Sequence, residues 1–152
     1  MQTRRKVLTH SSALLAMLAG AGLLPQTALA AFNKGAFDAK ALADAYKGLG
    51  ISAPAESKAV TLQAPDIAEN GAVVPVGVTT TLKGVKQVLL LVEKNPTALI
   101  AVFNVTDAVE PNFSTRTKMG QTSDVYAVVV TNDGKSFYTK KEVKVTLGGC
   151  GG

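Results

Sequence analysis

The chain has 152 residues, of which 47% are hydrophobic, and its 16 basic and 11 acidic residues give a formal net charge of +5. That length suits one domain with its own hydrophobic core. The basic excess does not indicate nucleic-acid binding, because no cluster of Lys and Arg is interleaved with aromatic residues. A single cysteine and a single histidine leave too few ligands for a zinc site of the usual kind.

Residues 1–30 have the pattern of an export signal. The charged start Arg4-Arg5-Lys6 is followed by an apolar run at 13–24 and by Ala28-Leu29-Ala30, whose small residues are typical of a cleavage site. The paired arginines favour the twin-arginine export route, with an ordinary secretory signal as the alternative. We expect cleavage after residue 30 and a periplasmic location for the rest of the chain.

Cleavage would change the chemistry that the chain can offer. It would remove three basic residues, no acidic residue and the only histidine, His10, so the formal net charge would fall from +5 to +2. No further apolar segment is long enough to cross a membrane. Cys150 would be a lone cysteine in an oxidising compartment, where disulfides form. It must then be paired with another molecule, reactive, or incidental.

The first part of the exported chain has a helical pattern. From Phe37 to Leu49 apolar residues recur every four positions, and this spacing predicts one amphipathic helix. Gly48 and Gly50 are expected to end it. Residues 51–58, which include a proline, are expected to form a connector.

After Lys58 the pattern changes to short β-branched runs separated by turn residues, which predicts an all-β sandwich. Asn132-Asp133-Gly134 is predicted to join two of the strands as a hairpin. In the last strand Val143, Val145 and Leu147 alternate with polar residues, which predicts one buried face. The predicted strands are 59–63, 72–82, 85–92, 98–106, the neighbourhood of Arg116, 125–131, 136–140 and 142–147.

Two groups of side chains have ordinary structural explanations. Lys140, Lys141 and Lys144 are interpreted as solvated strand residues, although they could also steer an anionic substrate or face an acidic partner. The aromatic side chains interpreted as core or interface contacts are Phe103, Phe113 and Phe137.

The last strand runs into Gly148-Gly149-Cys150-Gly151-Gly152. Four glycines around a cysteine are not expected to form a helix or strand, because glycine loses the most backbone entropy on ordering. We therefore predict a flexible arm at residues 148–152, which would extend roughly 17 Å from the domain at about 3.4 Å per residue. Such a thin arm could carry a thiol into a pocket of another protein.

Other interpretations of Cys150 remain open on these grounds. The cysteine could tether an exported β-sandwich to itself or to a partner through a disulfide, or it could be incidental in a disordered tail. A catalytic cysteine is disfavoured, because residues 31–152 contain no histidine to activate the thiol. Ubiquitin-like sulfur carriers also end in Gly-Gly, but they are activated at the terminal carboxylate in the cytoplasm, and the export signal argues against that.

Two motifs resemble the SoxY family. The tail GGCGG resembles the family's C-terminal ending, and residues 64–76, APDIAENGAVVPV, are similar to the family's P-x-I-A-E-N-G-x-x-V-P-V segment. The signal, the helix and the strands agree with the family as well, so the resemblance covers the whole chain. It implies an immunoglobulin-like β-sandwich at residues 31–147 that pairs with a second β-sandwich subunit, SoxZ.

The resemblance also implies a function. The chain would be a covalent carrier of sulfur intermediates in thiosulfate oxidation, with no cofactor and no enzyme activity of its own. A c-type haem enzyme, SoxXA, would join thiosulfate to Cys150 as a cysteine S-thiosulfonate. A hydrolase, SoxB, would release sulfate, and a sulfane dehydrogenase, SoxCD, would act on the persulfide sulfur that remains. Gly148, Gly149, Gly151 and Gly152 would form the carrier arm.

Residues 67–76 are the segment that we expect to face a partner, because their motif is more specific than a turn requires. Changing Asn70 or Pro75 is expected to weaken pairing.

Overall fold

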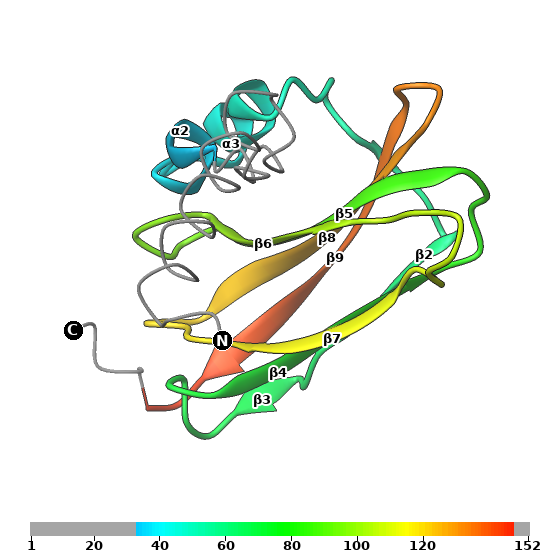
Figure 1. Cartoon of the computed structure of the whole chain (residues 1–152). Coiled ribbons are helices and arrows are strands. Elements are labelled where there is room, and N and C mark those ends of the chain that lie inside the picture. The colour runs from blue at the N-terminus through cyan, green and yellow to red at the C-terminus, as the bar shows by residue number, and fades with distance from the viewer. Residues whose placement is uncertain (1–32, 148–152) are drawn as a thin grey trace, which may run out of the picture. The chain divides into compact units, whose positions relative to one another are not determined.

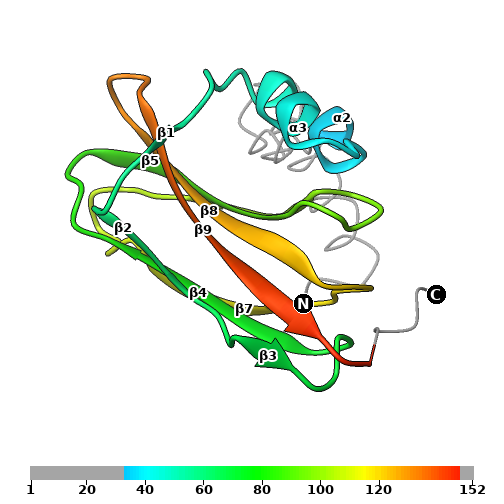
Figure 2. The ribbon, with the colours of Figure 1, turned by 180° about the vertical axis from the view of Figure 1, so that it is seen from behind.

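The structure is a computed structural model that describes residues 33–147, so the predicted signal at 1–30 and the predicted arm at 148–152 lie outside the described residues. Two β-sheets lie face to face (Figures 1 and 2). One has the strand order β1-β9-β8-β5-β6, with β3 also paired to β9, and the other has the order β2-β4-β7. The predicted all-β sandwich is confirmed, and its immunoglobulin-like character stays a prediction.

The helices and strands follow in chain order: α2 (Lys34–Phe37), α3 (Leu42–Gly48), β1 (Ala55–Glu56), β2 (Val60–Gln63), β3 (Ile67–Ala68), β4 (Val74–Thr80), β5 (Val85–Val92), β6 (Leu99–Asn104), β7 (Asn112–Thr117), β8 (Ser123–Thr131) and β9 (Ser136–Val145).

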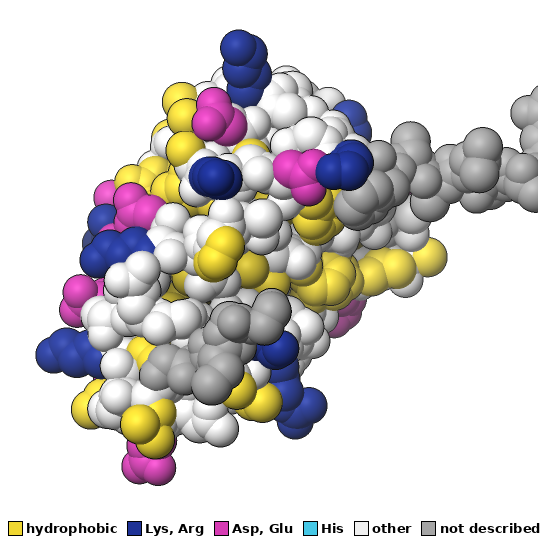
Figure 3. All heavy atoms as spheres, turned by 90° about the vertical axis from the view of Figure 1, so that its left-hand side faces the viewer, with side chains coloured by type: hydrophobic (Ala, Val, Ile, Leu, Met, Phe, Trp, Pro, Cys, Tyr) yellow, Lys and Arg dark blue, Asp and Glu magenta, His cyan; other side chains and the backbone are white. Residues whose placement is uncertain are grey.

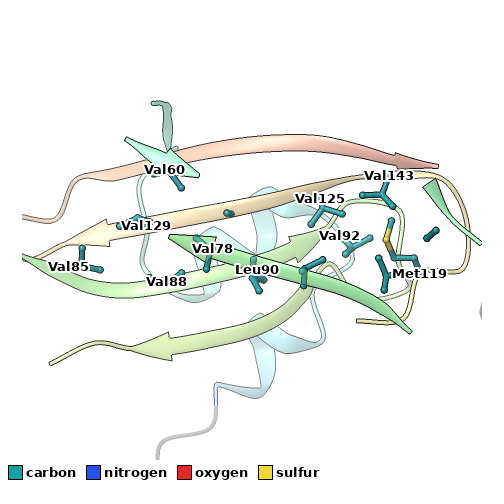
Figure 4. Close-up of a cluster of buried hydrophobic side chains, with 14 residues drawn as sticks. Val60, Val78, Val85, Val88, Leu90, Val92, Met119, Val125, Val129 and Val143 are labelled. Carbon is teal, nitrogen blue, oxygen red and sulfur yellow. The ribbon is translucent and has the colours of Figure 1, made fainter. Parts of the chain in front are cut away.

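The main core lies between the two sheets. Alternate residues of β4 are buried against alternate residues of β5 and β8, as the period of two in a half-buried strand requires. Figure 4 shows this cluster, with Met119 beside Val92 and Val143 at one end of it. The rings of Phe103 in β6 and Phe113 in β7 stack with their centroids 4.5 Å apart, which links the edges of the two sheets.

A second core lies on the outer face of the larger sheet, where α2 and α3 cover it (Figure 1). Ala36, Ala39 and Ala45 are buried there against Leu89 and Leu91 of β5 and against neighbouring strands. None of the described helices is long and apolar enough to cross a membrane. The sandwich therefore has one face covered by helices, while the outer face of the three-stranded sheet has no such layer among the described residues.

The predicted single helix at 37–49 is wrong, because two short helices take its place. The chain leaves the helical conformation after α2, and the carbonyl of Ala39 accepts a hydrogen bond from the amide of Ala98 at 2.9 Å. This long-range bond ties the break to the start of β6. Gly48 is the last residue of α3, as predicted, and a Cβ there would come within 3.0 Å of the Cα of Ala36, so glycine also permits close packing of the helices. Gly50, at φ +67°, ends the pair as predicted.

The last two predicted strands, 136–140 and 142–147, form one continuous strand, β9. It pairs antiparallel with β8 from Ser136 to Val143, and Gly134 adopts φ +81° in the connecting turn, so the predicted hairpin is confirmed. Val143 is buried and Val145 half-buried, as the alternation predicts. Leu147 is 70% exposed and lies beyond the strand, so its predicted burial is wrong.

Two strands were missing from the sequence prediction. β1 lies within the predicted connector at 51–58, and β3 lies within the family motif at 64–76. Each has two residues, which is too short for any periodicity to appear. Both pair with β9 in parallel, Ala55 opposite Phe137 and Ile67 opposite Lys144.

Candidate functional site at the end of the last strand

The predicted site residues Cys150, Gly148, Gly149, Gly151 and Gly152 lie outside the described residues. The structure instead describes the residues that precede them in the chain, at the end of β9. We call this place the arm base and define it as residues 144–147 together with the two segments that contact them, 66–73 and 119–122.

The first segment holds β9 through backbone pairing. Ile67 and Ala68 of β3 lie opposite Lys144 and Val145 in parallel register. The amide of Lys144 donates to the carbonyl of Asp66 at 3.0 Å, and the amide of Thr146 donates to the carbonyl of Ala68 at 3.2 Å. Because β8 pairs with the other edge of β9, the strand is hydrogen-bonded along both edges near its end.

The residues after β3 hold the chain beyond the strand. The amide of Gly71 donates to the carbonyl of Leu147 at 2.8 Å. The hydroxyl of Thr146 donates to the carbonyl of Glu69 at 3.1 Å. These bonds hold the chain as far as Leu147, which is three residues before Cys150 in the sequence.

The turn at residues 69–72 is closed by the side chain of Asn70. The Oδ1 atom of Asn70 accepts from the amide of Ala72 at 2.8 Å, which is an Asx turn. The carbonyl of Gly71 accepts from the amide of Met119 at 2.7 Å, so the turn is joined to the second segment of the arm base.

A change at Asn70 would therefore disturb this turn as well as any pairing with a partner subunit. Pro75 is exposed opposite Arg116 of β7 and remains a cleaner test of the pairing prediction.

The second segment meets the last strand through a side chain. The Oγ1 atom of Thr122 accepts from the amide of Val145 at 3.0 Å. This role of Thr122 gave no signal in the sequence. The role of residues 69–71 was signalled only by the specificity of the motif that contains them, and the structure shows that this motif anchors the arm base.

The arm base carries most of the large hydrophobic side chains that are exposed in the described part of the chain. Four large hydrophobic residues are exposed in the part of the chain that the structure describes, and three belong to the arm base: Ile67 at 57%, Val73 at 55% and Leu147 at 70%. The fourth, Val109 at 44%, lies in the connection between β6 and β7. Figure 3 views the domain from the left-hand side of Figure 1, and hydrophobic side chains reach the surface there among charged ones.

Two of the three strand lysines have structural partners. Lys140 lies 2.7 Å from a carboxylate oxygen of Asp124, and this hydrogen bond raises the lysine pKa above its usual value. Lys141 lies 3.0 Å from a carboxylate oxygen of Asp66 and donates to the carbonyl of Ala64 at 2.6 Å. Lys144 forms no ion pair with any described residue. The interpretation as ordinary strand lysines therefore fits the first two, and steering by any of them stays a prediction.

The described residues contain no group of three or more His, Cys, Asp or Glu side chains placed to hold a metal ion. Met119 is the one sulfur-containing side chain among the described residues. Its side chain is fully buried in the core, with 0% exposure, so it serves packing at the arm base.

A family model described as sulfur oxidation protein SoxY matches residues 46–150, which is most of the chain. The chain belongs to the SoxY family. The match contains the whole arm base and ends at Cys150, and it confirms the resemblance seen in the two sequence motifs. A search of curated proteins found no match.

Solved structures agree with this family. The sulfur carrier protein SoxY from Chlorobium limicola f. thiosulfatophilum is 36% identical, with a TM-score of 0.61, and the alignment covers 69% of this chain and 96% of that one. A superoxide reductase (neelaredoxin) from Ignicoccus hospitalis is 19% identical, with a TM-score of 0.52 over 60% of this chain and 82% of that one. The second likeness shows a shared fold alone.

Proposed function

We propose that this SoxY-family chain carries sulfur intermediates covalently on Cys150 during thiosulfate oxidation. The observation that carries the proposal is the arm base: the chain is hydrogen-bonded as far as Leu147, and its only cysteine follows three residues later between glycines. The name of the Chlorobium relative, a sulfur carrier protein, supports the same role. The anchored origin would let partner enzymes meet the thiol at a defined distance.

Loading is an oxidation that needs a two-electron acceptor. The thiol of Cys150 loses its proton and its sulfur bonds to the terminal sulfur of thiosulfate: RSH + S₂O₃²⁻ → RS–S–SO₃⁻ + H⁺ + 2e⁻. In this proposal the electrons pass to the c-type haem enzyme that the family implies, SoxXA. The carrier itself supplies only the thiol and its position.

Unloading by hydrolysis needs no electron acceptor. Water attacks the sulfonate sulfur and the bond between the two outer sulfurs breaks: RS–S–SO₃⁻ + H₂O → RS–S⁻ + SO₄²⁻ + 2H⁺. The hydrolase SoxB is the implied catalyst, and SoxCD would oxidise the persulfide sulfur left on the carrier. The chain would act as a substrate of these enzymes and as a subunit paired with SoxZ.

Location is part of the proposal. Residues 1–30 would direct the chain to the periplasm by the twin-arginine route, which accepts folded cargo. A chain that binds no cofactor has no evident need to fold before export, so we propose that SoxZ is assembled with it in the cytoplasm. Replacing Arg4 and Arg5 by lysine should then retain both subunits in the cytoplasm, and periplasmic SoxZ in that mutant would contradict co-export.

The carrier role is tested by intact mass spectrometry of protein purified from the periplasm of cells grown on thiosulfate. We expect an adduct with the mass of a thiosulfonate or of added sulfur atoms, removable by reductant and absent from Cys150→Ser. A clean thiol would contradict the proposal. A disulfide-linked dimer as the sole product would favour the alternative, a β-sandwich tethered through Cys150.

A further inference from the structure

Three exposed aliphatic side chains, Ile67, Val73 and Leu147, lie on the hydrogen-bonded segments of the arm base, and we call this set the apolar patch. Ile67 is in β3, Val73 follows the turn at 69–72, and Leu147 accepts the hydrogen bond from Gly71 within that turn. The three therefore belong to segments joined by hydrogen bonds, although 67 and 147 are far apart in the chain. Exposed aliphatic side chains on neighbouring segments indicate a contact surface.

The patch is small. Three partly exposed aliphatic side chains present roughly 300 Å² or less, which is the size of the largest apolar patch on an ordinary monomer. A stable subunit interface needs about 800 Å² from each partner. The patch alone is thus suited to a contact that forms and breaks, rather than to a permanent subunit.

The short stretch of chain between Leu147 and Cys150 indicates which kind of partner would contact the patch. At about 3.5 Å per residue, the Cα of Cys150 lies no more than roughly 11 Å from that of Leu147. Any protein that acts on the thiol must therefore bring its active site close to the patch, and the surface around the active-site entrance must lie against it. Lys144, opposite Ile67 and free of ion pairs with the described residues, stands beside the patch as a positive charge.

We propose that the patch of Ile67, Val73 and Leu147 is the docking surface for the entrance of an enzyme active site that acts on sulfur bound to Cys150. The matching rim of the enzyme is apolar, with a carboxylate opposite Lys144. This inference rests on the proposed function and adds the surface by which partner enzymes recognise the carrier. Contact at the patch supplies affinity for the carrier, while the chemical step takes place at the sulfur atoms.

The test uses a carrier loaded without any enzyme. Tetrathionate reacts with a thiolate as RS⁻ + S₄O₆²⁻ → RS–S–SO₃⁻ + S₂O₃²⁻, and intact mass confirms the adduct. Sulfate release by the purified hydrolase from the same organism is then measured against carrier concentration. The variant is the double change Ile67→Ser with Val73→Ser. The matched control is Val109→Ser, which alters the fourth exposed aliphatic residue away from the arm base.

We expect kcat/KM to fall about tenfold or more in the double variant, through a higher KM with little change in kcat, because truncating contact residues weakens binding. Val109→Ser should stay within about twofold of the unmodified carrier. The altered side chains are more than two-fifths exposed, so we expect the thermal unfolding of each variant to be unchanged. That result would show that the fold is intact.

An unchanged kcat/KM in the double variant would overturn the docking surface and leave the carrier role standing. Loss of SoxZ binding or of self-association in the double variant, seen by size-exclusion chromatography, would also overturn it, because the patch would then be a subunit interface. Absence of sulfate release from the loaded unmodified carrier would overturn both the docking surface and the carrier role.

Discussion

The two ends of β9 are held in different ways. At its start the strand continues from a hairpin whose hydrogen bonds are local, from the amide of Thr131 to the carbonyl of Lys135 at 2.9 Å and from the amide of Gly134 to the carbonyl of Thr131 at 2.9 Å. At its end the contacts are distant in sequence, and the Thr146 hydroxyl reaches the carbonyl of Glu69 across 77 positions.

Both ends also receive a short parallel strand, β1 at the start and β3 at the end. The difference is that the start turns back into the domain, while the end leads toward Cys150. Hydrogen bonds from the distant segment 66–71 hold residues 144–147 in place, so the end of β9 needs no local turn to fix it. The end of β9 therefore depends on tertiary contacts, whereas its start depends on a local turn, and the following changes test the two ends separately.

The largest effect is expected from Met119→Ala, which removes core packing at the arm end. The side chain is fully buried beside Val92 and Val143 (Figure 4), so a cavity should lower the free energy of unfolding by about 2–5 kcal/mol. Unfolding in urea measures this loss in the free energy of unfolding. Met119→Leu keeps the volume and should cost less than about 1.5 kcal/mol. A loss below about 1 kcal/mol for alanine would mean that the arm end is loosely packed.

Gly134→Ala should weaken the hairpin end by about 1–2 kcal/mol, because residue 134 has φ +81° and the left-handed region is unfavourable for residues with a Cβ. A Cβ there would meet nothing within 4 Å, so the cost is conformational and not steric. Gly120 also has open space around it but lacks a positive φ, so Gly120→Ala is the matched control and should be near neutral. Equal effects at the two positions, measured by thermal unfolding, would contradict this reasoning.

Thr122→Val should loosen the arm end by about 0.5–1.5 kcal/mol, because the amide of Val145 loses its acceptor. Amide hydrogen exchange should quicken near Val145 and remain unchanged around Ser136. Thr139→Val is the control, since the Thr139 side chain makes no hydrogen bond in the described part of the chain. Faster exchange at both ends of β9 would show that the strand responds as one unit.

The smallest effect is expected from Asp133→Asn at the hairpin end. Hydrogen bonds from Thr131 and then Lys135 lower the Asp133 pKa from 3.8 to about 2. Since the folded-state pKa is the lower one, the carboxylate stabilises the fold above about pH 4, and this contribution is lost as the pH falls toward 2. Asp133 is fully exposed, so the effect is small and weakens with salt. The melting temperatures of the two proteins should differ slightly at pH 6 and converge near pH 2. A difference that grows on acidification would refute the assignment.

The sequence was informative wherever a signal is local. The hairpin turn at 132–134 was predicted correctly because Asn, Asp and Gly favour that backbone conformation in any surroundings. The strand at 85–92 matches β5, since a continuous β-branched and aliphatic run is typical of a buried strand. The motif at 64–76 and the tail identified the family, which the family model confirmed.

The sequence was misleading wherever distant residues decide the outcome. The helical period at 37–49 was real, but the chain leaves the helical conformation between α2 and α3, where Ala39 accepts a hydrogen bond from the distant Ala98. β1 and β3 have no periodicity of their own and exist because β9 offers them an edge.

By itself, the sequence determined the class of fold, the family and Cys150 as the residue to test, because composition, turn residues and a specific motif are readable without a partner. Only the tertiary structure decided how the chain is held just before residue 148. It showed that residues 66–73 and Thr122 hold the end of β9, and that Ile67, Val73 and Leu147 are exposed on these hydrogen-bonded segments. The physical reason is that a hydrogen bond or an apolar contact forms between residues that are close in space, and nothing local in the chain records a neighbour that lies 77 positions away.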